Sequence, residues 1–279
     1  MNRERVVPAV FALIIAGVVG GFLSGMFGVG GGLVMVPLLM SLAHMDQRRA
    51  SATSLVAIIP TALVGAIGYT VGGEINFAAA GLIAVGGIVG APVGSYLLRH
   101  LSLTWLRWML FAIMVLAAAR LMFVIPLRGT SLTLDIATIV ALIGLGLVMG
   151  IASGLFGIGG GIIVVPALMA LFGVSDLAAK GTSLLAMIPA AISGSLPNLR
   201  ASLVRLSDGL IVGAAAVLAS LGGVSLAFIV PPALSGILFG SFLLAVAIRM
   251  VVLAHLKERK ARKERAAHQD ENDKAKESA

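Results

Sequence analysis

Two glycine-rich runs hold the residues with the clearest potential for binding chemistry. The first reads SGMFGVGGGLVMVP over residues 24–37, and the second reads SGLFGIGGGIIVVP over residues 153–166. Because each glycine destabilises a helix interior by up to about 1 kcal/mol relative to alanine, both runs predict a break in an apolar helix. The short helix after each break begins with unpartnered backbone N–H groups and a partial positive charge. Such a start can bind a small anion without a charged side chain.

The candidate substrate-binding residues are glycines of these runs and nearby hydroxyl side chains. Serine and threonine can donate to an anion, but they also bond to their own helix or to a neighbouring one, and the sequence leaves both roles open. The candidates are Ser24, Gly28, Gly30, Gly31, Gly32, Thr53, Ser54, Ser153, Gly157, Gly159, Gly160, Gly161, Thr182 and Ser183. Glycine at every fourth position is instead typical of close helix packing, and this spacing occurs at Gly17, Gly21 and Gly25 and at Gly146, Gly150 and Gly154.

No catalytic or metal-binding residues are expected. The chain has no cysteine, which excludes disulfides, thiolate chemistry and cysteine-type metal sites. The histidines show no His-x-x-x-His spacing, and no arrangement of nucleophile, base and metal is recognisable. Neither glycine run is followed by Lys-Ser or Lys-Thr, which argues against a nucleotide-binding loop. We therefore expect neither an enzyme nor a cofactor.

The glycine runs belong to an internal repeat with an offset of 129 residues (153 minus 24). With the same offset and no gap, the Thr-Ser-Leu segment that begins at Thr53 aligns with the one that begins at Thr182. Arg120 aligns with Arg249. We interpret both arginines as residues that snorkel from a span end to the headgroups, with a functional role as the alternative.

The composition indicates an integral membrane protein. Of the 279 residues, 59% are hydrophobic and 11% are charged, whereas a soluble domain has roughly 25% charged residues. We predict an all-α membrane protein with two tandem repeats, residues 1–127 and 128–256, each with about four long transmembrane helices and a short half-helix after its glycine break. Residues 257–279 form a basic tail that we expect to be disordered and cytoplasmic. The apolar segments span about residues 8–26, 51–71, 78–98, 105–126, 134–154, 208–230 and 233–254.

The positive charges predict the orientation of the two repeats. If the short helix after each glycine run crosses the membrane, each repeat makes an odd number of crossings and the second repeat is inverted relative to the first. The inner side then holds most of the loop arginines, as the positive-inside rule requires, and both termini are cytoplasmic. Only Arg128 and Lys180 lie outside, whereas the inner arginines are Arg3, Arg5, Arg48, Arg49, Arg99, Arg107, Arg200 and Arg205.

Both repeats share a longer motif. A Ser-Gly-x-Phe-Gly-x-Gly-Gly-Gly run leads into Val-Pro and is followed by Ala-Thr-Ser-Leu or Gly-Thr-Ser-Leu and a proline. This pattern resembles the sulfite exporter TauE/SafE family of bacterial permeases, over nearly the whole membrane part from Gly17 to about Met250. The resemblance implies a carrier in the cytoplasmic membrane for sulfur-containing anions such as sulfite, sulfoacetate or other organosulfonates. Tyr69 aligns with Asn198, so the two halves of the cavity need not be chemically equal.

We interpret the chain as a secondary transporter that exports a small sulfur-containing anion by alternating access about a central site. Its expected partners are this anion and membrane lipids, without nucleic acid, and its expected location is the bacterial inner membrane; homo-oligomerisation is left open. Two alternatives remain. One is a cation permease that uses carbonyl groups of the same breaks, and the other is a non-transporting membrane scaffold with the basic tail as its docking element.

Overall fold

The computed structural model describes residues 3–102 and 134–231 without a gap, together with scattered residues of 104–119 and 233–252. Within these residues every regular element is an α-helix. The predicted tail at 257–279 lies outside the described residues, as do Arg120 and Arg249. The chain is thus an all-helical membrane protein, and six of its described helices are long and apolar enough to cross a bilayer.

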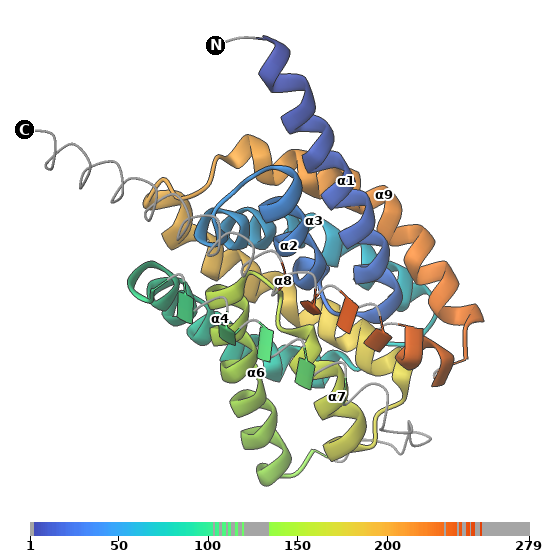
Figure 1. The fold of residues 1–279 in the computed structure, drawn as a ribbon. Helices are drawn as coiled ribbons and strands as arrows, with labels where there is room; N and C mark the ends of the chain where they lie inside the picture. The colour runs from blue at the N-terminus through green and yellow to red at the C-terminus, as the bar shows by residue number, and fades with distance from the viewer. Residues whose placement is uncertain are drawn as a thin grey trace, which may run out of the picture.

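The helices follow the sequence repeat (Figure 1). The third and fourth helices of each half begin at matching positions, since 47 and 176, like 77 and 206, differ by 129. The first half comprises α1 (Arg3–Phe27), α2 (Gly32–Leu42), α3 (Gln47–Val71) and α4 (Phe77–His100), and the second comprises α6 (Ile136–Phe156), α7 (Gly161–Phe172), α8 (Asp176–Arg200) and α9 (Leu206–Ile229).

Four of the long helices begin with a side-chain cap. The side-chain oxygens of Asp46, Asn76, Asp135 and Ser175 accept hydrogen bonds from backbone N–H groups in the first turns of α3, α4, α6 and α8. Such caps satisfy N–H donors that have no partner within the helix. At the exposed start of α6, hydrogen bonds from Thr138 hold the pKa of Asp135 below its usual range.

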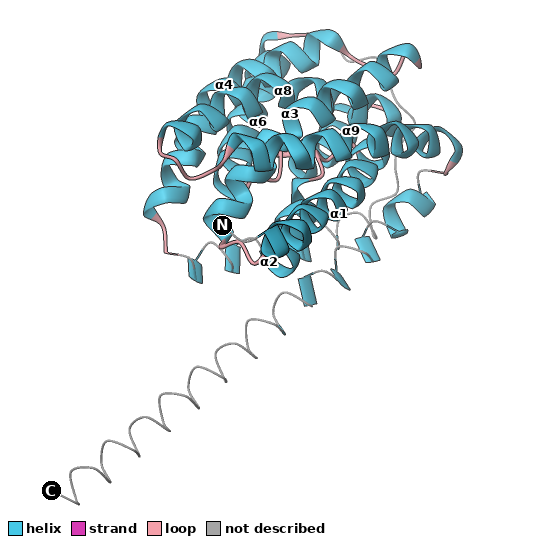
Figure 2. Ribbon diagram, turned by 90° about the horizontal axis from the view of Figure 1, so that it is seen from above, coloured by secondary structure: helices cyan, strands magenta, loops and turns pink. Residues whose placement is uncertain are grey.

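The two halves interlock. Helix α1 packs along α9, and α4 packs along α6, so the first helix of each half lies against the fourth helix of the other (Figures 1 and 2). Helices α3 and α8 contact each other, and each also contacts the fourth helix of the opposite half. Each of these contacts has a counterpart in which the two halves swap roles, as expected if the duplicated sequences adopt the same fold.

Glycines allow the interlocked helices to approach with their backbones in contact. A methyl group on Gly21 would overlap the backbone of Ala216 in α9 and lie 2.7 Å from its carbonyl carbon. Likewise, a methyl group on Gly150 would lie 2.8 Å from the backbone nitrogen of Ala91 in α4. The packing role predicted from the four-residue glycine spacing is therefore confirmed.

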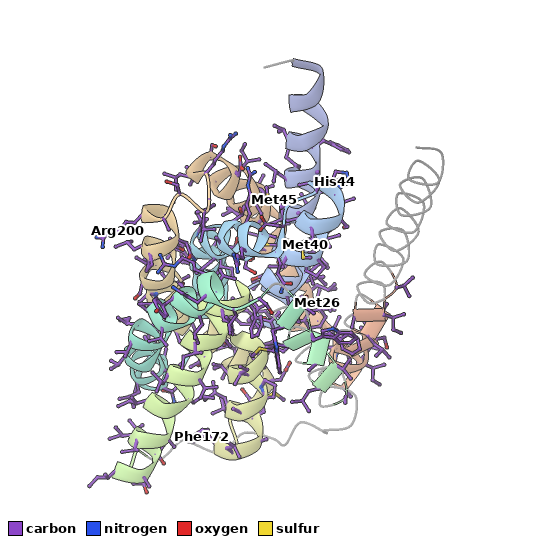
Figure 3. The ribbon with its side chains drawn as sticks, turned by 60° about the vertical axis from the view of Figure 1, so that its left-hand side comes forward. Met26, Met40, His44, Met45, Phe172 and Arg200 are labelled. Atoms are coloured by element: carbon purple, nitrogen blue, oxygen red, sulfur yellow. The ribbon has the colours of Figure 1, made fainter. Side chains whose placement is uncertain are left out.

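The two short helices run outward from the middle of the bundle toward opposite ends. His44, which follows α2, and Phe172, the last residue of α7, lie at opposite ends of the molecule in Figure 3. Opposed short helices are what an inverted repeat requires. The inversion of the two halves relative to a membrane stays a prediction.

Replacing Gly146 with alanine is expected to lower the thermal stability of the protein in detergent. The new methyl group would overlap the carbonyl oxygen of Ile83 and lie 2.8 Å from its carbonyl carbon, and overpacking of this kind costs about 1–3 kcal/mol. Gly144→Ala, two residues away on the same helix, is the matched control, because a methyl group there meets no atom within 4 Å. The melting temperatures of the purified variants test this prediction, and equal values for both would contradict it.

Candidate functional site

The two glycine runs meet at the centre of the bundle. A methyl group on Gly30 would lie 3.3 Å from the Cα atom of Gly159, and a methyl group on Gly159 would lie 3.3 Å from the Cα atom of Gly30. A methyl group on Gly161 would lie 2.6 Å from the Cα atom of Val29. The breaks of the two halves are therefore in direct backbone contact, 129 residues apart in the sequence.

The breaks depend on backbone conformations that favour glycine. Gly28 ends the regular part of α1 with a φ of 67°, and Gly157 ends α6 with the same φ. The N–H groups of these two glycines donate to the carbonyl oxygens of Ser24 and Ser153, each at 2.8 Å. Residues other than glycine rarely adopt this left-handed backbone conformation at a helix end. The predicted interruption of both helices is confirmed, and positive φ values also occur at Gly30, Gly31, Gly159 and Gly160.

The starts of α2 and α7 are buried in this central region and lack a side-chain cap. Their N-cap residues are Gly31 and Gly160, and neither start shows a side-chain cap hydrogen bond among the described residues. The first turn of each helix instead directs its backbone N–H groups toward the breaks, with the partial positive charge of a helix start. Two such starts in one place provide donors for a small anion.

The serine candidates lie near the breaks but differ in their hydrogen bonds. Ser54 Oγ donates to the carbonyl oxygen of Gly157 at 2.8 Å, which links α3 to the break of the other half. Ser183 occupies the equivalent position in α8, yet its buried hydroxyl has no partner in the part of the chain that the structure describes. The hydroxyls of Ser24 and Ser153 are also fully buried and without a partner there. Three of the four serines therefore have hydrogen-bonding capacity left for a ligand.

The threonine candidates make their contacts away from the breaks. Thr182 Oγ1 accepts a hydrogen bond from the N–H group of Asn76 at 3.0 Å, and so holds the turn between α3 and α4. Thr53 Oγ1 lies 3.9 Å from the sulfur of Met45, in the turn before α3. The sequence-based view that both Thr-Ser pairs line the site thus fits the serines better than the threonines. Their part in substrate binding stays a prediction.

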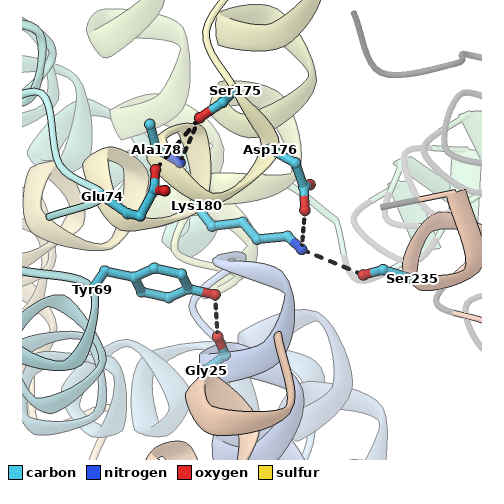
Figure 4. Close-up of polar contacts among 8 residues, drawn as sticks. All are labelled: Gly25, Tyr69, Glu74, Ser175, Asp176, Ala178, Lys180 and Ser235. Carbon is cyan, nitrogen blue, oxygen red and sulfur yellow. Dashed lines mark hydrogen bonds and ion pairs between the residues drawn. The ribbon is translucent and has the colours of Figure 1, made fainter. Parts of the chain in front are cut away.

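Lys180 is a residue near the breaks that the sequence reasoning did not connect with the site. The structure places it near the start of α8, where it is only 3% exposed, and its predicted position on the outer side stays a prediction. Its ammonium group donates to Asp176 Oδ2 at 2.6 Å and to Ser235 Oγ at 3.3 Å (Figure 4). Helix α8 is the least apolar of the six spans and was absent from the apolar segments found in the sequence. The repeat offset was the signal that could have found it.

The residues at positions 69 and 198 also make the halves unequal. Tyr69 donates its hydroxyl proton to the carbonyl oxygen of Gly25, at 2.8 Å, from α3 to α1 (Figure 4). Asn198 instead donates to the carbonyl oxygen of Gly194 within its own helix at 3.3 Å and to Ser95 Oγ at 3.4 Å.

Within the described residues, no group of three His, Asp or Glu side chains is arranged to hold a metal ion.

Comparisons with known proteins give one consistent result. The family model described as Sulfite exporter TauE/SafE matches residues 2–121 and 142–276. The probable membrane transporter protein YunE of Bacillus subtilis is 27% identical over 211 residues, which cover 67% of this chain and 77% of YunE. The probable membrane transporter protein YdhB of the same organism is 30% identical over 180 residues, covering 63% of this chain and 73% of YdhB. A probable membrane transporter protein of Xylella fastidiosa is 31% identical over 188 residues, covering 65% and 70%. No solved structure matches the chain.

Replacing Ser54 with alanine is expected to lower the free energy of unfolding by about 1 kcal/mol, because it removes a buried hydrogen bond and leaves the Gly157 carbonyl without that donor. Ser183→Ala, at the equivalent position, is the matched control and should change stability little, since no partner for its hydroxyl is present among the described residues. Thermal unfolding of both variants without added anion measures the difference. A larger loss for Ser183→Ala than for Ser54→Ala would contradict the assignment.

Proposed function

Because the chain belongs to the sulfite exporter TauE/SafE family, we propose that this membrane permease carries a small sulfur-containing anion, such as sulfite or an organosulfonate. The family name and the names of the relatives support transport as the activity, rather than an enzymatic reaction. The proposed substrate is an oxoanion with a compact charged group. The proposed direction is export from the cytoplasm across the inner membrane, with both termini cytoplasmic.

The observation that supports an anionic substrate most directly is the pair of uncapped helix starts at the centre. Helices α2, α7 and α9 begin without a side-chain cap, but α9 begins at the exposed Arg205, whereas the starts of α2 and α7 at Gly31 and Gly160 are buried. Backbone N–H groups at such starts favour negative charge and suit the oxygens of a sulfite or sulfonate. The buried hydroxyls of Ser24, Ser153 and Ser183 supply further donors.

Binding requires the two breaks to separate. In the present conformation, a methyl group added to Gly30 would lie only 3.3 Å from the Cα atom of Gly159. A sulfite ion is larger than a methyl group and does not fit between the two residues. Alternating access moves packed bodies around such a site. Because α1 packs along α9 and α4 along α6, we infer that these two cross-half pairs move as units, and not the two sequence halves.

The membrane potential can drive the proposed export. An inside-negative potential expels an anion with roughly 2.3 kcal/mol per elementary charge per 100 mV. Coupling to a second ion is therefore not required for net export.

The direct test is counterflow of labelled sulfite into proteoliposomes of the purified protein, with sulfoacetate, taurine, sulfate and chloride as competitors. We expect saturable uptake that a subset of these anions inhibits. Absence of flux in folded protein would contradict the anion carrier. Flux inhibited by inorganic cations but not by sulfonates would instead identify a cation permease.

Gly30→Ala is expected to reduce counterflow strongly, because its φ is 81° and the new methyl group would lie 2.8 Å from the sulfur of Met187, inside the break. A non-glycine residue in this conformation costs about 1–2 kcal/mol. Gly73→Ala is the matched control, since Gly73 has a φ of 73° but lies in a loop where a methyl group meets no atom within 4 Å. Equal counterflow by the two variants, at equal amounts of inserted protein, would remove the backbone site from the proposal.

A further inference from the structure

A buried ammonium group lies beside the break of the first half, and the helix-start site does not use it. Lys180 is 3% exposed, and a methyl group on Gly28 would lie 2.5 Å from its Cα atom and 2.6 Å from its Cβ atom. The α8 backbone at Lys180 thus packs directly on the end of α1. A charged side chain within a membrane span is costly to bury and generally has a function.

The ammonium has one carboxylate as its counter-charge. Asp176 Oδ2 lies 2.6 Å from Lys180 Nζ, and Ser235 Oγ lies 3.3 Å from it (Figure 4). The ring of Phe27 lies on another side, with its centroid 6.0 Å from Nζ. The second carboxylate of this region, Glu74, accepts a hydrogen bond from Ser175 Oγ at 3.5 Å instead. Lys180 and Asp176 therefore form a compact ion pair within α8, and the ammonium group also donates to Ser235.

The equivalent position in the other half shows that packing alone does not require this charge. Subtracting the offset of 129 from 180 gives Ser51, which packs on Gly157 as Lys180 packs on Gly28. Asp176 corresponds to Gln47, which is 2% exposed and neutral. The same backbone contact is thus made in one half with a serine and a glutamine, and in the other with a buried ion pair. The ion pair calls for a different explanation from the contact itself.

A second observation points to a ligand on the same face of α8. Ser183 follows Lys180 by three residues, so the two side chains project from neighbouring positions on one face of the helix. The Ser183 hydroxyl is fully buried and has no hydrogen-bond partner within the described part of the chain. Its counterpart Ser54 does have a partner, the carbonyl oxygen of Gly157. Lys180, which packs on the break at Gly28, and the unused hydroxyl donor of Ser183 therefore belong to one face of α8.

We propose that Lys180 is a second substrate contact, which exchanges Asp176 for the oxoanion group of the substrate during transport. This inference rests on the proposed function. In the empty protein the Asp176 carboxylate occupies the place of the anion and keeps the buried ammonium paired. The incoming sulfite or sulfonate oxygens take over the ammonium and the Ser183 hydroxyl, and Asp176, which is partly exposed, turns away. When the anion leaves, Asp176 returns, so the ammonium remains paired throughout the cycle.

The exchange also explains how the protein selects its substrate. The compact ammonium group of Lys180 binds charged oxygens most strongly, because it forms a charge-assisted hydrogen bond with them. Chloride is a single atom without oxygens, so it does not present separate acceptors to Lys180 Nζ and Ser183 Oγ and gains less from this pair of donors. The site is consequently specific for small oxoanions over halides.

The test removes both charges together. Removal of one partner alone would leave an unpaired buried charge and strongly destabilise the protein. The double variant D176N/K180Q avoids this, because it removes both charges. We expect its KM for sulfite counterflow to rise about tenfold, with weakened discrimination against chloride, since a charge-assisted hydrogen bond is lost. Insertion and the melting temperature of the empty protein check that the variant is folded.

The matched control is the double variant R49Q/D208N. It removes an ion pair of similar length, 2.7 Å, whose side chains are 39% and 16% exposed, and it should leave KM unchanged. If the wild type carries sulfite but D176N/K180Q has the same KM and anion selectivity as the wild type, the Lys180–Asp176 ion pair is only structural and the inference is overturned. If the wild type carries no oxoanion at all, the proposed function itself fails, and the inference fails with it.

Discussion

The fold depends on one constraint: backbone N–H and C=O groups buried away from water must find partners inside the protein. Regular helices meet this requirement by themselves except in their first and last turns, but the two glycine breaks do not. They exist because each is enclosed by the other and by α3 and α8, with Ser54 donating to the carbonyl oxygen of Gly157. The central site is therefore a consequence of placing two unwound segments where they protect each other.

Glycine fulfils two separate requirements in this arrangement. At Gly28 and Gly157 it supplies the left-handed conformation that ends a helix. At Gly21 and Gly150 it removes the side chain that would keep α1 from α9 and α6 from α4. This close packing holds each half against the other. A motion that opens the central breaks would therefore move the packed pairs α1 with α9 and α4 with α6.

The sequence predicted the elements that depend on local residue type and on the repeat. Consecutive glycines located both breaks and the starts of α2 and α7, and the four-residue spacing identified the packing faces. It did not identify α8 as an apolar segment, because Lys180 and Asp176 lower the apolar character of a helix that is nevertheless buried. It also could not distinguish the serines from the threonines, since their partners come from distant elements such as Asn76 and Gly157. The division into residues 1–127 and 128–256, and the role of every candidate in binding, stay predictions.

The two halves share a backbone plan but differ in polar side chains, and this difference has a thermodynamic limit. Tyr69 corresponds to Asn198, and Lys180 corresponds to Ser51, so an anion carried as proposed would meet different side chains in the two halves. For a carrier without a coupled reaction, unequal binding changes the affinity on each side and the rate in each direction. It cannot change the equilibrium, which the anion gradient and the membrane potential set together. In the proposed carrier, side-chain asymmetry therefore tunes the concentration at which transport saturates, whereas the anion gradient and the membrane potential decide the net direction.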